Sequence, residues 1–410
     1  MASQPHEPIA APAGGEGSDP PRGGQQPAAC EVTIVAHDIG SLRGMERQLS
    51  ALVIGLRELG HRVTVIARTC EPSVAEGVSF HRVKGPSRPF LLAYPWFMLA
   101  GSLAVRRRRR GVVHATGAIV LGRVDVIAVH YCHQVGTATP SRDNWLFRAH
   151  VKLSGILKRI GERICYRPGR AAAFVCVSEG VAAELREHFP RIADRTLTIY
   201  NGIDTQSFAP GPRRVQARAR RAELGIGGQR LVAAFVGSEW ERKGLAPLIR
   251  ALALAPDWML VVAGEGDERR YRELARTAGV GEAIRWLGVS GDVGLVYALA
   301  DAFVLPSSYE TFSLVSFEAA ASGLPVLATP VNGVRELIVD GHNGFLISTE
   351  PREIAERLER LAADPGLRRR LGDAARESAL AFGRERMVAA HSELYVRFAA
   401  AAAPASKRSS

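Results

Sequence analysis

The chain has 410 residues, enough for two or three domains of ordinary size. Hydrophobic residues make up 47% of it and charged residues 23%, a balance typical of a globular protein with a buried core. The formal net charge of +12 favours anionic partners, which include phosphates, anionic lipid headgroups and nucleic acid. Charge alone does not choose among these partners.

The cysteines indicate neither a disulfide framework nor a zinc site. Their number is odd and no C-x-x-C pair occurs, so we expect a reducing, cytoplasmic compartment. Residues 1–29 are rich in Pro, Gly and Ala without an apolar centre, and predict a disordered tail rather than a signal peptide; residues 400–410 predict a second tail. No run of 18 apolar residues predicts a membrane-spanning helix. The five cysteines are Cys30, Cys70, Cys132, Cys165 and Cys176.

The first half of the chain predicts alternating strands and helices. Glu31–Gly40 predicts a strand that ends in a loop, and apolar residues at helical spacing follow it. His61–Arg68 predicts a second strand, which completes a β-α-β unit of the kind that forms parallel sheets. Further strands are predicted at 111–117 and 125–133, and a strand, turn and helix at 171–189. The helical spacing is that of Leu49, Leu52, Val53, Leu56 and Leu59.

The pattern breaks at 201–222, where Gly, Pro and charged residues cluster, and this predicts a linker. A second α/β series follows to about residue 375. We therefore predict an α/β protein with two doubly wound Rossmann-like lobes, 30–200 and 223–375, and a ligand cleft at the carboxyl ends of their sheets. Residues 376–399 predict a helix that returns to the first lobe. The predicted strands of the second lobe are 230–237, 258–267, 283–288, 302–307, 324–330 and 344–348, and its predicted helices are 244–255, 294–301 and 312–323.

Two glutamates in the second lobe form an E-x7-E pair. Glu310 lies in the loop after a predicted strand, and Glu318 lies inside the helix that follows. Eight residues of helix span ~12 Å, a length that suits a nucleotide-diphosphate sugar with hydroxyl groups at both ends. The backbone N–H groups of Thr311 to Leu314 would face the diphosphate at the start of the helix.

A second motif supplies positive charge. Arg242 and Lys243 precede Gly244 at the predicted start of the helix that follows the strand 230–237. Two adjacent cations there would neutralise a leaving diphosphate, and the glycine would allow a close backbone approach. Either motif alone is common on solvated helix surfaces, so their order and surroundings matter more than their presence.

In this order, the motifs resemble the retaining glycosyltransferases of the glycogen-synthase-like GT-B class, family 4. The resemblance runs from about Val32 to Ile347 and includes the runs Tyr200–Asp204, Gly264–Glu268 and Trp286–Gly288. One departure is Ser238, where many members carry Arg. Arg242 beside Lys243 resembles the arrangement in lipopolysaccharide-core glucosyltransferases.

The resemblance implies a nucleotide-diphosphate sugar donor, with a UDP-sugar favoured, transfer of a hexose-type sugar with retention, and no cofactor. No D-x-D motif occurs, so we expect no metal ion at the diphosphate. No protein general base is implied, since the diphosphate itself can take the acceptor proton. The implied catalytic residues are Glu310 and His130, with His133 as the alternative to His130. The implied donor-binding residues are Gly44, Arg242, Lys243, Gly288, Phe312, Ser313, Leu314 and Glu318.

Two basic segments of the first lobe favour contact with an anionic membrane. Pro89–Arg110 joins an apolar run to five consecutive arginines, and Lys152–Arg167 is basic and amphipathic. The alternative is a core helix with a solvated charged end. We expect peripheral attachment at the inner face of the membrane, a glycan or glycolipid acceptor of cell-envelope synthesis, and no nucleic acid, because no recognised module accompanies the arginines.

Two other functions remain open. One is a GT-B nucleotide-sugar epimerase, which has no separate acceptor, and the other is a nucleotide-sugar-binding subunit that supports a partner transferase. A dinucleotide-dependent dehydrogenase fits poorly, because no G-x-G-x-x-G follows the first strand.

Overall fold

A computed structural model describes residues 29–41, 44–136, 145–228 and 230–402 of the chain. The predicted tail 1–29 therefore lies outside the described residues except for its last position. Of the predicted tail 400–410, residues 400–402 form the end of a helix, and the rest lies outside the described residues.

The first lobe is built on a seven-stranded sheet whose neighbouring strands are all parallel. Its central strands are rich in Val, Ile and Ala and almost wholly buried, as parallel strands covered on both faces are. A small two-strand pair, β2 (Asp38–Ile39) with β4 (Thr69–Cys70), lies beside it. The sheet order is β5 (Ser79–Arg82), β3 (Arg62–Ala67), β1 (Glu31–Val35), β6 (Val112–Thr116), β7 (Val126–Val129), β8 (Ala173–Cys176) and β9 (Thr196–Thr198).

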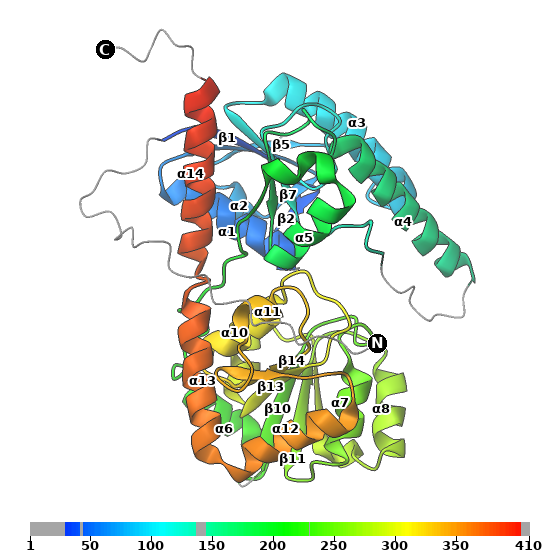
Figure 1. The fold of residues 1–410 in the computed structure, drawn as a ribbon, viewed down its shortest axis with the longest axis vertical. Helices are drawn as coiled ribbons and strands as arrows, with labels where there is room; N and C mark the ends of the chain where they lie inside the picture. Colours follow the sequence, from blue (N-terminus) through cyan, green and yellow to red (C-terminus); the bar gives the residue numbers. More distant parts are fainter. Residues whose placement is uncertain (1–28, 42–43, 137–144, 229, 403–410) are drawn as a thin grey trace, which may run out of the picture.

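Helices cover both faces of this sheet (Figure 1). On one face, α1 and α14 pack with the short helix α2 against side chains such as Val32 and Ile34. On the other face, α3, α4 and α5 pack against side chains such as Val35 and Ile127. The helices are α1 (Gly44–Glu58), α2 (Pro72–Ala75), α3 (Phe90–Arg108), α4 (Trp145–Cys165), α5 (Glu179–His188) and α14 (Arg384–Ala402), with a 3-10 turn η1 (Pro190–Arg195) after α5.

The second lobe is built on a six-stranded parallel sheet. Helices α7, α8 and α12 contact one another along the sheet, and Trp258 Nε1 donates to Leu358 O between β11 and α12. Helices α6 and α9 pair, as do α10 and α13. The sheet order is β12 (Ile284–Gly288), β11 (Trp258–Ala263), β10 (Leu231–Val236), β13 (Ala302–Leu305), β14 (Val326–Ala328) and β15 (Gly344–Leu346). The helices are α6 (Arg214–Glu223), α7 (Leu245–Leu252), α8 (Glu268–Thr277), η2 (Gly281–Ala283), α9 (Val293–Ala298), α10 (Leu314–Ala321), α11 (Val334–Leu337), α12 (Pro351–Ala363) and α13 (Pro365–Leu380).

The prediction of two doubly wound α/β lobes is confirmed. The details of the connection differ from the expectation, because α6 occupies the second half of the predicted linker. This helix packs on α9 of the second lobe and buries Ala217. Helix α13 also stays with the second lobe to Leu380, so the return to the first lobe begins after residue 380 rather than at 376.

The chain crosses between the lobes twice, and the two crossings lie side by side. Ile203 N donates to Phe382 O and Arg384 N donates to Ile203 O. Helix α14 then packs along α1. In the loop that follows α1, His61 Nε2 lies 2.7 Å from Ser392 Oγ of α14. The lobes are therefore joined by two adjacent backbone crossings, one at Ile203 and one at the break between α13 and α14 (Figure 1).

Candidate active site

The carboxyl ends of both sheets face each other between the lobes. Ser178 Oγ, at the start of α5, donates to Thr311 O before α10 at 2.7 Å. Gly44 at the start of α1 lies opposite Leu314, and a Cβ on Gly44 would be 3.2 Å from Leu314 Cδ1. The amino-terminal ends of α1 and α10 therefore lie close to one another across the cleft, where the first N–H groups of each helix have no partner within the helix.

Glu310 is held by two cations on its own lobe. Its Oε1 lies 2.8 Å from Lys243 Nζ and 3.2 Å from Arg242 Nη1, and it accepts a hydrogen bond of 3.1 Å from Ser307 Oγ. Arg242 also lies 2.8 Å from Glu239. The structure thus brings together three residues that the sequence predicted for one site, around a single carboxylate oxygen.

The charge balance at Glu310 favours its ionised form. Burial alone would raise the pKa of this carboxyl, but Lys243 and Arg242 outweigh burial and hold the pKa below its ordinary value. Burial opposes charge on Arg242 too, and Glu310 nevertheless raises the pKa of that guanidinium. Glu310 is therefore a carboxylate throughout the neutral range, able to accept hydrogen bonds from sugar hydroxyl groups.

The glycine after these cations is required by the backbone. Gly244 precedes α7 with φ of 77°, a left-handed conformation that side chains disfavour. A Cβ at this position would also lie 2.0 Å from Pro306 O. Close packing of this turn on β13 therefore places Arg242 and Lys243 beside Glu310.

Glu318 lies in α10 and is 4% exposed. Tyr297 donates to its Oε2 at 3.1 Å, and Arg47 of the first lobe reaches its Oε1 at 3.2 Å. Burial raises the pKa of Glu318, and Arg47 and Tyr297 only partly offset that effect. Neither Arg47 nor Tyr297 was predicted for the site, and the only signal for Arg47 was its position just after the glycine-containing loop.

The residues at the start of α10 meet the cleft through their backbone. Phe312 is 1% exposed and its ring stacks on Phe317 at 4.2 Å, so its side chain belongs to the core. Ser313 has φ of 65°, and its hydroxyl pairs with Ser316 at 2.8 Å. Leu314 is half-buried. A ligand at this helix would therefore find N–H groups rather than the side chains of Phe312 and Ser313.

Gly288 ends β12 with φ of 63°, and no atom lies within 4 Å of the position where a Cβ would stand. This left-handed conformation favours a glycine.

His130 follows β7 at the carboxyl edge of the first sheet and is half-buried. Its Nε2 is buried without a hydrogen-bond partner among the described residues. Burial, together with a smaller effect of the nearby His391, lowers the pKa of His130 to about 4. His130 and His391 line a cavity of about 20 Å³ with His114 and Gln48, a space sufficient for one water molecule.

His133, the alternative to His130, belongs to a different network. Its Nδ1 and its backbone N both lie 2.8 Å from Glu162 Oε1, and Gln134 donates to Glu162 Oε2. Glu162 is 1% exposed, so this network fixes the loop after β7 against α4.

The described residues contain no group of three or more His, Cys, Asp or Glu side chains that could hold a metal ion. Within the same part of the chain, no helix is long and apolar enough to cross a membrane.

Two family models match the chain in succession. The Glycosyltransferase Family 4 model matches residues 42–207, and the model of glycosyl transferases group 1 matches residues 216–378. A D-inositol 3-phosphate glycosyltransferase of Salinispora arenicola is 31% identical over 331 residues, which cover 72% of this chain and 74% of that protein. The chain belongs to the family 4 glycosyltransferases.

Solved structures agree with this family 4 fold. WaaG, described as a glycosyltransferase involved in lipopolysaccharide biosynthesis, aligns with a TM-score of 0.73 and 21% identity over 88% of this chain and 98% of its own. Sucrose-phosphate synthase from Thermosynechococcus elongatus aligns with a TM-score of 0.74 and 22% identity over 91% of this chain and 100% of its own. The family 4 chain has the GT-B fold.

Other relatives match over a smaller share of their length. The D-inositol 3-phosphate glycosyltransferase of Streptomyces bingchenggensis is 33% identical over 244 residues, which cover 55% of this chain and 53% of that protein. That of Corynebacterium aurimucosum is matched over 63% of both chains at 33% identity. The alignments thus span about half to two thirds of these family 4 relatives.

Proposed function

We propose that the chain is a retaining, metal-independent glycosyltransferase. It transfers a hexose-type sugar from a nucleotide-diphosphate sugar, with a UDP-sugar favoured, to a glycan or glycolipid acceptor in cell-envelope synthesis. The observation that carries the proposal is the convergence of Lys243 and Arg242 on Glu310 at the carboxyl end of the second sheet. Family membership supports the reaction class.

A buried cation, Lys243, and a half-buried one, Arg242, beside a helix start suit a diphosphate. Lys243 and Arg242 would bind its oxygens, and the N–H groups at the start of α10 would add partial positive charge. Both features are in place before the bond breaks, which is the condition for stabilising a leaving group without reorganisation. The same charges make a divalent cation unnecessary.

The anomeric configuration is retained because the acceptor attacks the anomeric carbon on the same face from which the diphosphate leaves. The bond between the anomeric carbon and the diphosphate oxygen breaks, the acceptor oxygen bonds to that carbon, and its proton passes to the diphosphate. Glu310 holds hydroxyl groups of the transferred sugar close to the reacting carbon, and His130 helps to position it. Glu318 holds the ribose at the other end of the donor, together with contacts from Gly44, Gly288 and the backbone of 312–314.

The acceptor belongs to the first lobe in this proposal. Exposed apolar side chains form a stripe on each of the first-lobe helices α3 and α4 and support peripheral attachment to the inner face of an anionic membrane, where a glycolipid acceptor would be met. The α3 stripe is Leu92, Trp96, Leu99 and Leu103, and the α4 stripe is Trp145, Ile156 and Ile160. Several relatives are named D-inositol 3-phosphate glycosyltransferase, so this sugar phosphate is a second candidate acceptor. UDP-glucose is a reasonable first donor, because a structural neighbour from Anabaena was solved in complex with it.

A donor and acceptor panel tests the proposal. Each nucleotide sugar is incubated with the protein, with and without lipid-linked glycans or D-inositol 3-phosphate, and released nucleotide diphosphate is measured. We expect the release of nucleotide diphosphate to depend on the acceptor. We also expect NMR to show that the anomeric configuration of the product linkage, axial or equatorial, matches that of the donor. Conversion of the nucleotide sugar without an acceptor would indicate the epimerase instead. Donor binding without turnover on any acceptor would indicate the nucleotide-sugar-binding subunit.

A further inference from the structure

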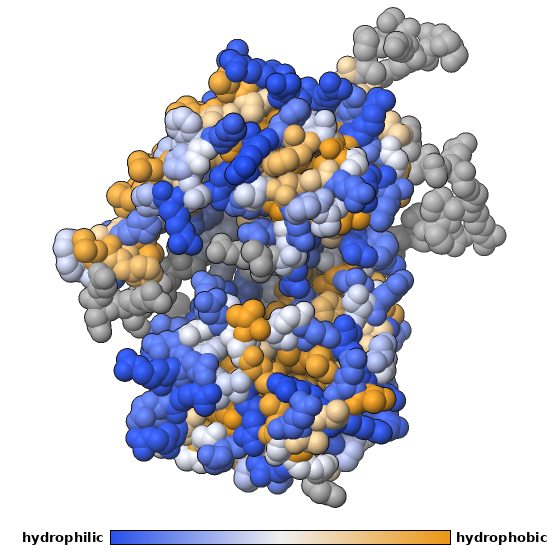
Figure 2. All heavy atoms as spheres, turned by 180° about the vertical axis from the view of Figure 1, so that it is seen from behind, coloured by the Kyte–Doolittle hydropathy of each residue, from blue (hydrophilic) through white to orange (hydrophobic). Residues whose placement is uncertain are grey.

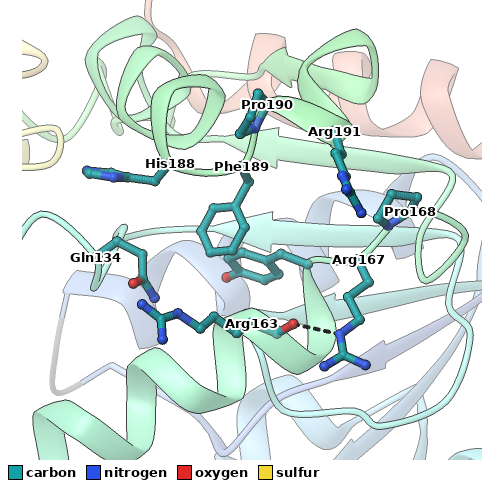
Figure 3. A pocket seen from close by; sticks show the side chains of 9 residues that line it. Gln134, Arg163, Arg167, Pro168, His188, Phe189, Pro190 and Arg191 are labelled. Atoms are coloured by element: carbon teal, nitrogen blue, oxygen red, sulfur yellow. Dashed lines mark hydrogen bonds between the residues drawn. The ribbon is translucent and has the colours of Figure 1, made fainter.

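A cavity of about 680 Å³ opens on the first lobe, apart from the interlobe site, between the end of α4 and the segment that follows α5 (Figure 3). This volume is in the range of small-molecule sites. Figure 3 shows Arg163 on α4 and Phe189 pointing toward it from the opposite side. The lining residues that matter here are Arg163, Arg167, Arg191, His188, Tyr166 and Phe189.

The cavity is strongly positive. None of its lining residues is acidic, and no ion pair of Arg163, Arg167 or Arg191 occurs within the described parts of the chain. The neighbouring carboxylate of Glu162 is turned inward, where His133 and Gln134 occupy both of its oxygens. Three guanidinium groups that share one solvent-filled space repel one another unless an anion lies between them.

The back of the cavity is apolar and rigid. Tyr166 is 4% exposed and meets the Phe189 ring edge-on at 5.3 Å. Arg167 Nε donates to Arg163 O at 3.0 Å, which fixes one arginine against the end of α4. A ligand with a phosphate and a short apolar stem would satisfy both parts of the cavity.

One of the three arginines, Arg163, continues an exposed apolar stripe of α4. Trp145, Ile156 and Ile160 are 72%, 37% and 46% exposed. Arg163 follows Ile160 by three residues, close to one helical turn, so it extends the same face, and Arg167 follows just after the end of α4 at Cys165. Arg163 lies only ~4.5 Å further along the axis than Ile160.

Helix α3 packs beside α4 and carries a second apolar stripe. Leu92, Trp96, Leu99 and Leu103 recur at helical spacing and are each between 45% and 63% exposed. Figure 2 shows orange groups along the edge of the upper lobe on the side where these two helices lie. Exposed Trp and Leu beside exposed Arg are the composition of a helix that rests in the lipid interface.

We propose that the α4 cavity binds a lipid whose headgroup is a phosphate monoester, while the α3 and α4 stripes rest on the bilayer. This inference rests on the membrane attachment in the proposed function and adds a specific ligand to it. Three arginines, with no acidic residue among the lining side chains, match a headgroup of up to two negative charges. The several N–H donors of each planar guanidinium group suit a terminal phosphate. The stripe brings the cavity to headgroup depth, which favours a lipid over a free phosphate or a nucleic acid.

The test is vesicle flotation at matched surface charge. Phosphatidylcholine vesicles carry either phosphatidic acid or phosphatidylserine, adjusted to equal zeta potential. The wild type is expected to bind the phosphatidic acid vesicles at least about threefold more tightly. The variant R163Q/R167Q/R191Q should lose this preference. The control R106Q/R107Q/R108Q removes the same charge from exposed arginines at the end of α3, and should keep the preference while binding all anionic vesicles more weakly.

Any of the following results would overturn the proposal: equal binding of both vesicle types by the wild type, equal loss of preference in both triple variants, or tighter binding of single-stranded RNA than of any vesicle. Thermal melting checks folding, and the single variant R191Q replaces the triple variant if the latter unfolds. Saturation by millimolar glycerol 3-phosphate without vesicle preference would mean a free-phosphate site and also contradict the proposal. Glycosyl transfer to a water-soluble acceptor is measured in parallel, so failure of the lipid site is distinguished from failure of the proposed reaction.

Discussion

Arg47 of the first lobe and Glu318 of the second form an ion pair across the cleft, with 3.2 Å between Nη2 and Oε1. Glu318 is buried and Arg47 is 41% exposed, so the pair forms at the edge of the space where the proposed donor would lie. Arg47 stands one turn into α1, whose start meets Leu314. Helix α1 would thus lie beside the bound donor, and its residue Arg47 pairs with the Glu318 carboxylate that would bind the ribose of the donor.

Replacing Arg47 by Gln should shift the pH dependence of nucleotide binding. Burial raises the pKa of Glu318 and Arg47 opposes that rise, so removing the guanidinium should raise the pKa further. UDP affinity should then begin to fall at higher pH than in the wild type, by about one pH unit or less, since Arg47 is partly solvent-screened. Calorimetric titrations between pH 5 and 8 measure the shift. Arg47→Lys should behave like the wild type, and coincident profiles for Arg47→Gln would refute the coupling.

Substitutions of Glu318 and Glu310 should have different effects on nucleotide affinity and on turnover. Glu318→Ala should weaken both the intact donor and free UDP, because both carry the ribose. Glu310→Gln should leave UDP affinity within about threefold and lower turnover instead, since contacts near the anomeric carbon strengthen as charge develops there. Calorimetry with UDP and steady-state rates with the donor report the two effects. Equal loss of UDP affinity in both variants would contradict the placement of Glu318 at the ribose and Glu310 at the transferred sugar.

Glu310 should also contribute pH-dependent stability. Its pKa is lowered in the folded protein, so its contribution is fully present above the unfolded value of ~4.3 and is lost as pH falls through the folded value. Glu310→Gln should therefore cost about 3 kcal/mol of unfolding free energy at pH 7, because it leaves two cations without their carboxylate. Urea denaturation should show this difference constant above about pH 5 and shrinking below pH 4. A difference that grows on acidification contradicts the ion-pair assignment.

Metal removal should not affect the reaction. The positive charge at the proposed diphosphate site comes from Arg242, Lys243 and the N–H groups of α10. Rates with and without EDTA should agree within error, at saturating donor and acceptor. Loss of turnover in EDTA with recovery in magnesium would show that these groups are insufficient.

The sequence predicted the features that depend on local pattern. Apolar runs such as that of β10 identify strands, because a parallel strand covered on both faces needs Val, Ile or Ala at nearly every position. Glu310, Lys243 and Arg242 could be found because each lies just after a predicted strand, where parallel sheets present their ligands. The order of elements then sufficed for two doubly wound lobes.

The remaining features depend on how distant elements meet. Arg47 and Glu318 are 271 positions apart, and only the placement of the lobes makes them partners. Helix α6 is rich in arginine and buries little more than Ala217, so its sequence resembles a linker. The sequence predicted that the backbone N–H groups of 311–314 face the diphosphate, but it did not indicate that the Phe312 side chain stacks on Phe317 in the core.

In the proposed function, a nucleotide diphosphate binds at Arg242 and Lys243 between the lobes. Calorimetric titration of UDP into the variant R242A/K243A tests it most directly. The matched control R272A/R276A removes two arginines from exposed ion pairs on α8 of the same lobe. We expect R242A/K243A to lose about 100-fold or more in UDP affinity, because two charge-assisted contacts are removed, while the control binds UDP like the wild type. If R242A/K243A remains folded by circular dichroism and binds UDP with unchanged affinity, the donor does not lie at these residues and the proposed site is wrong.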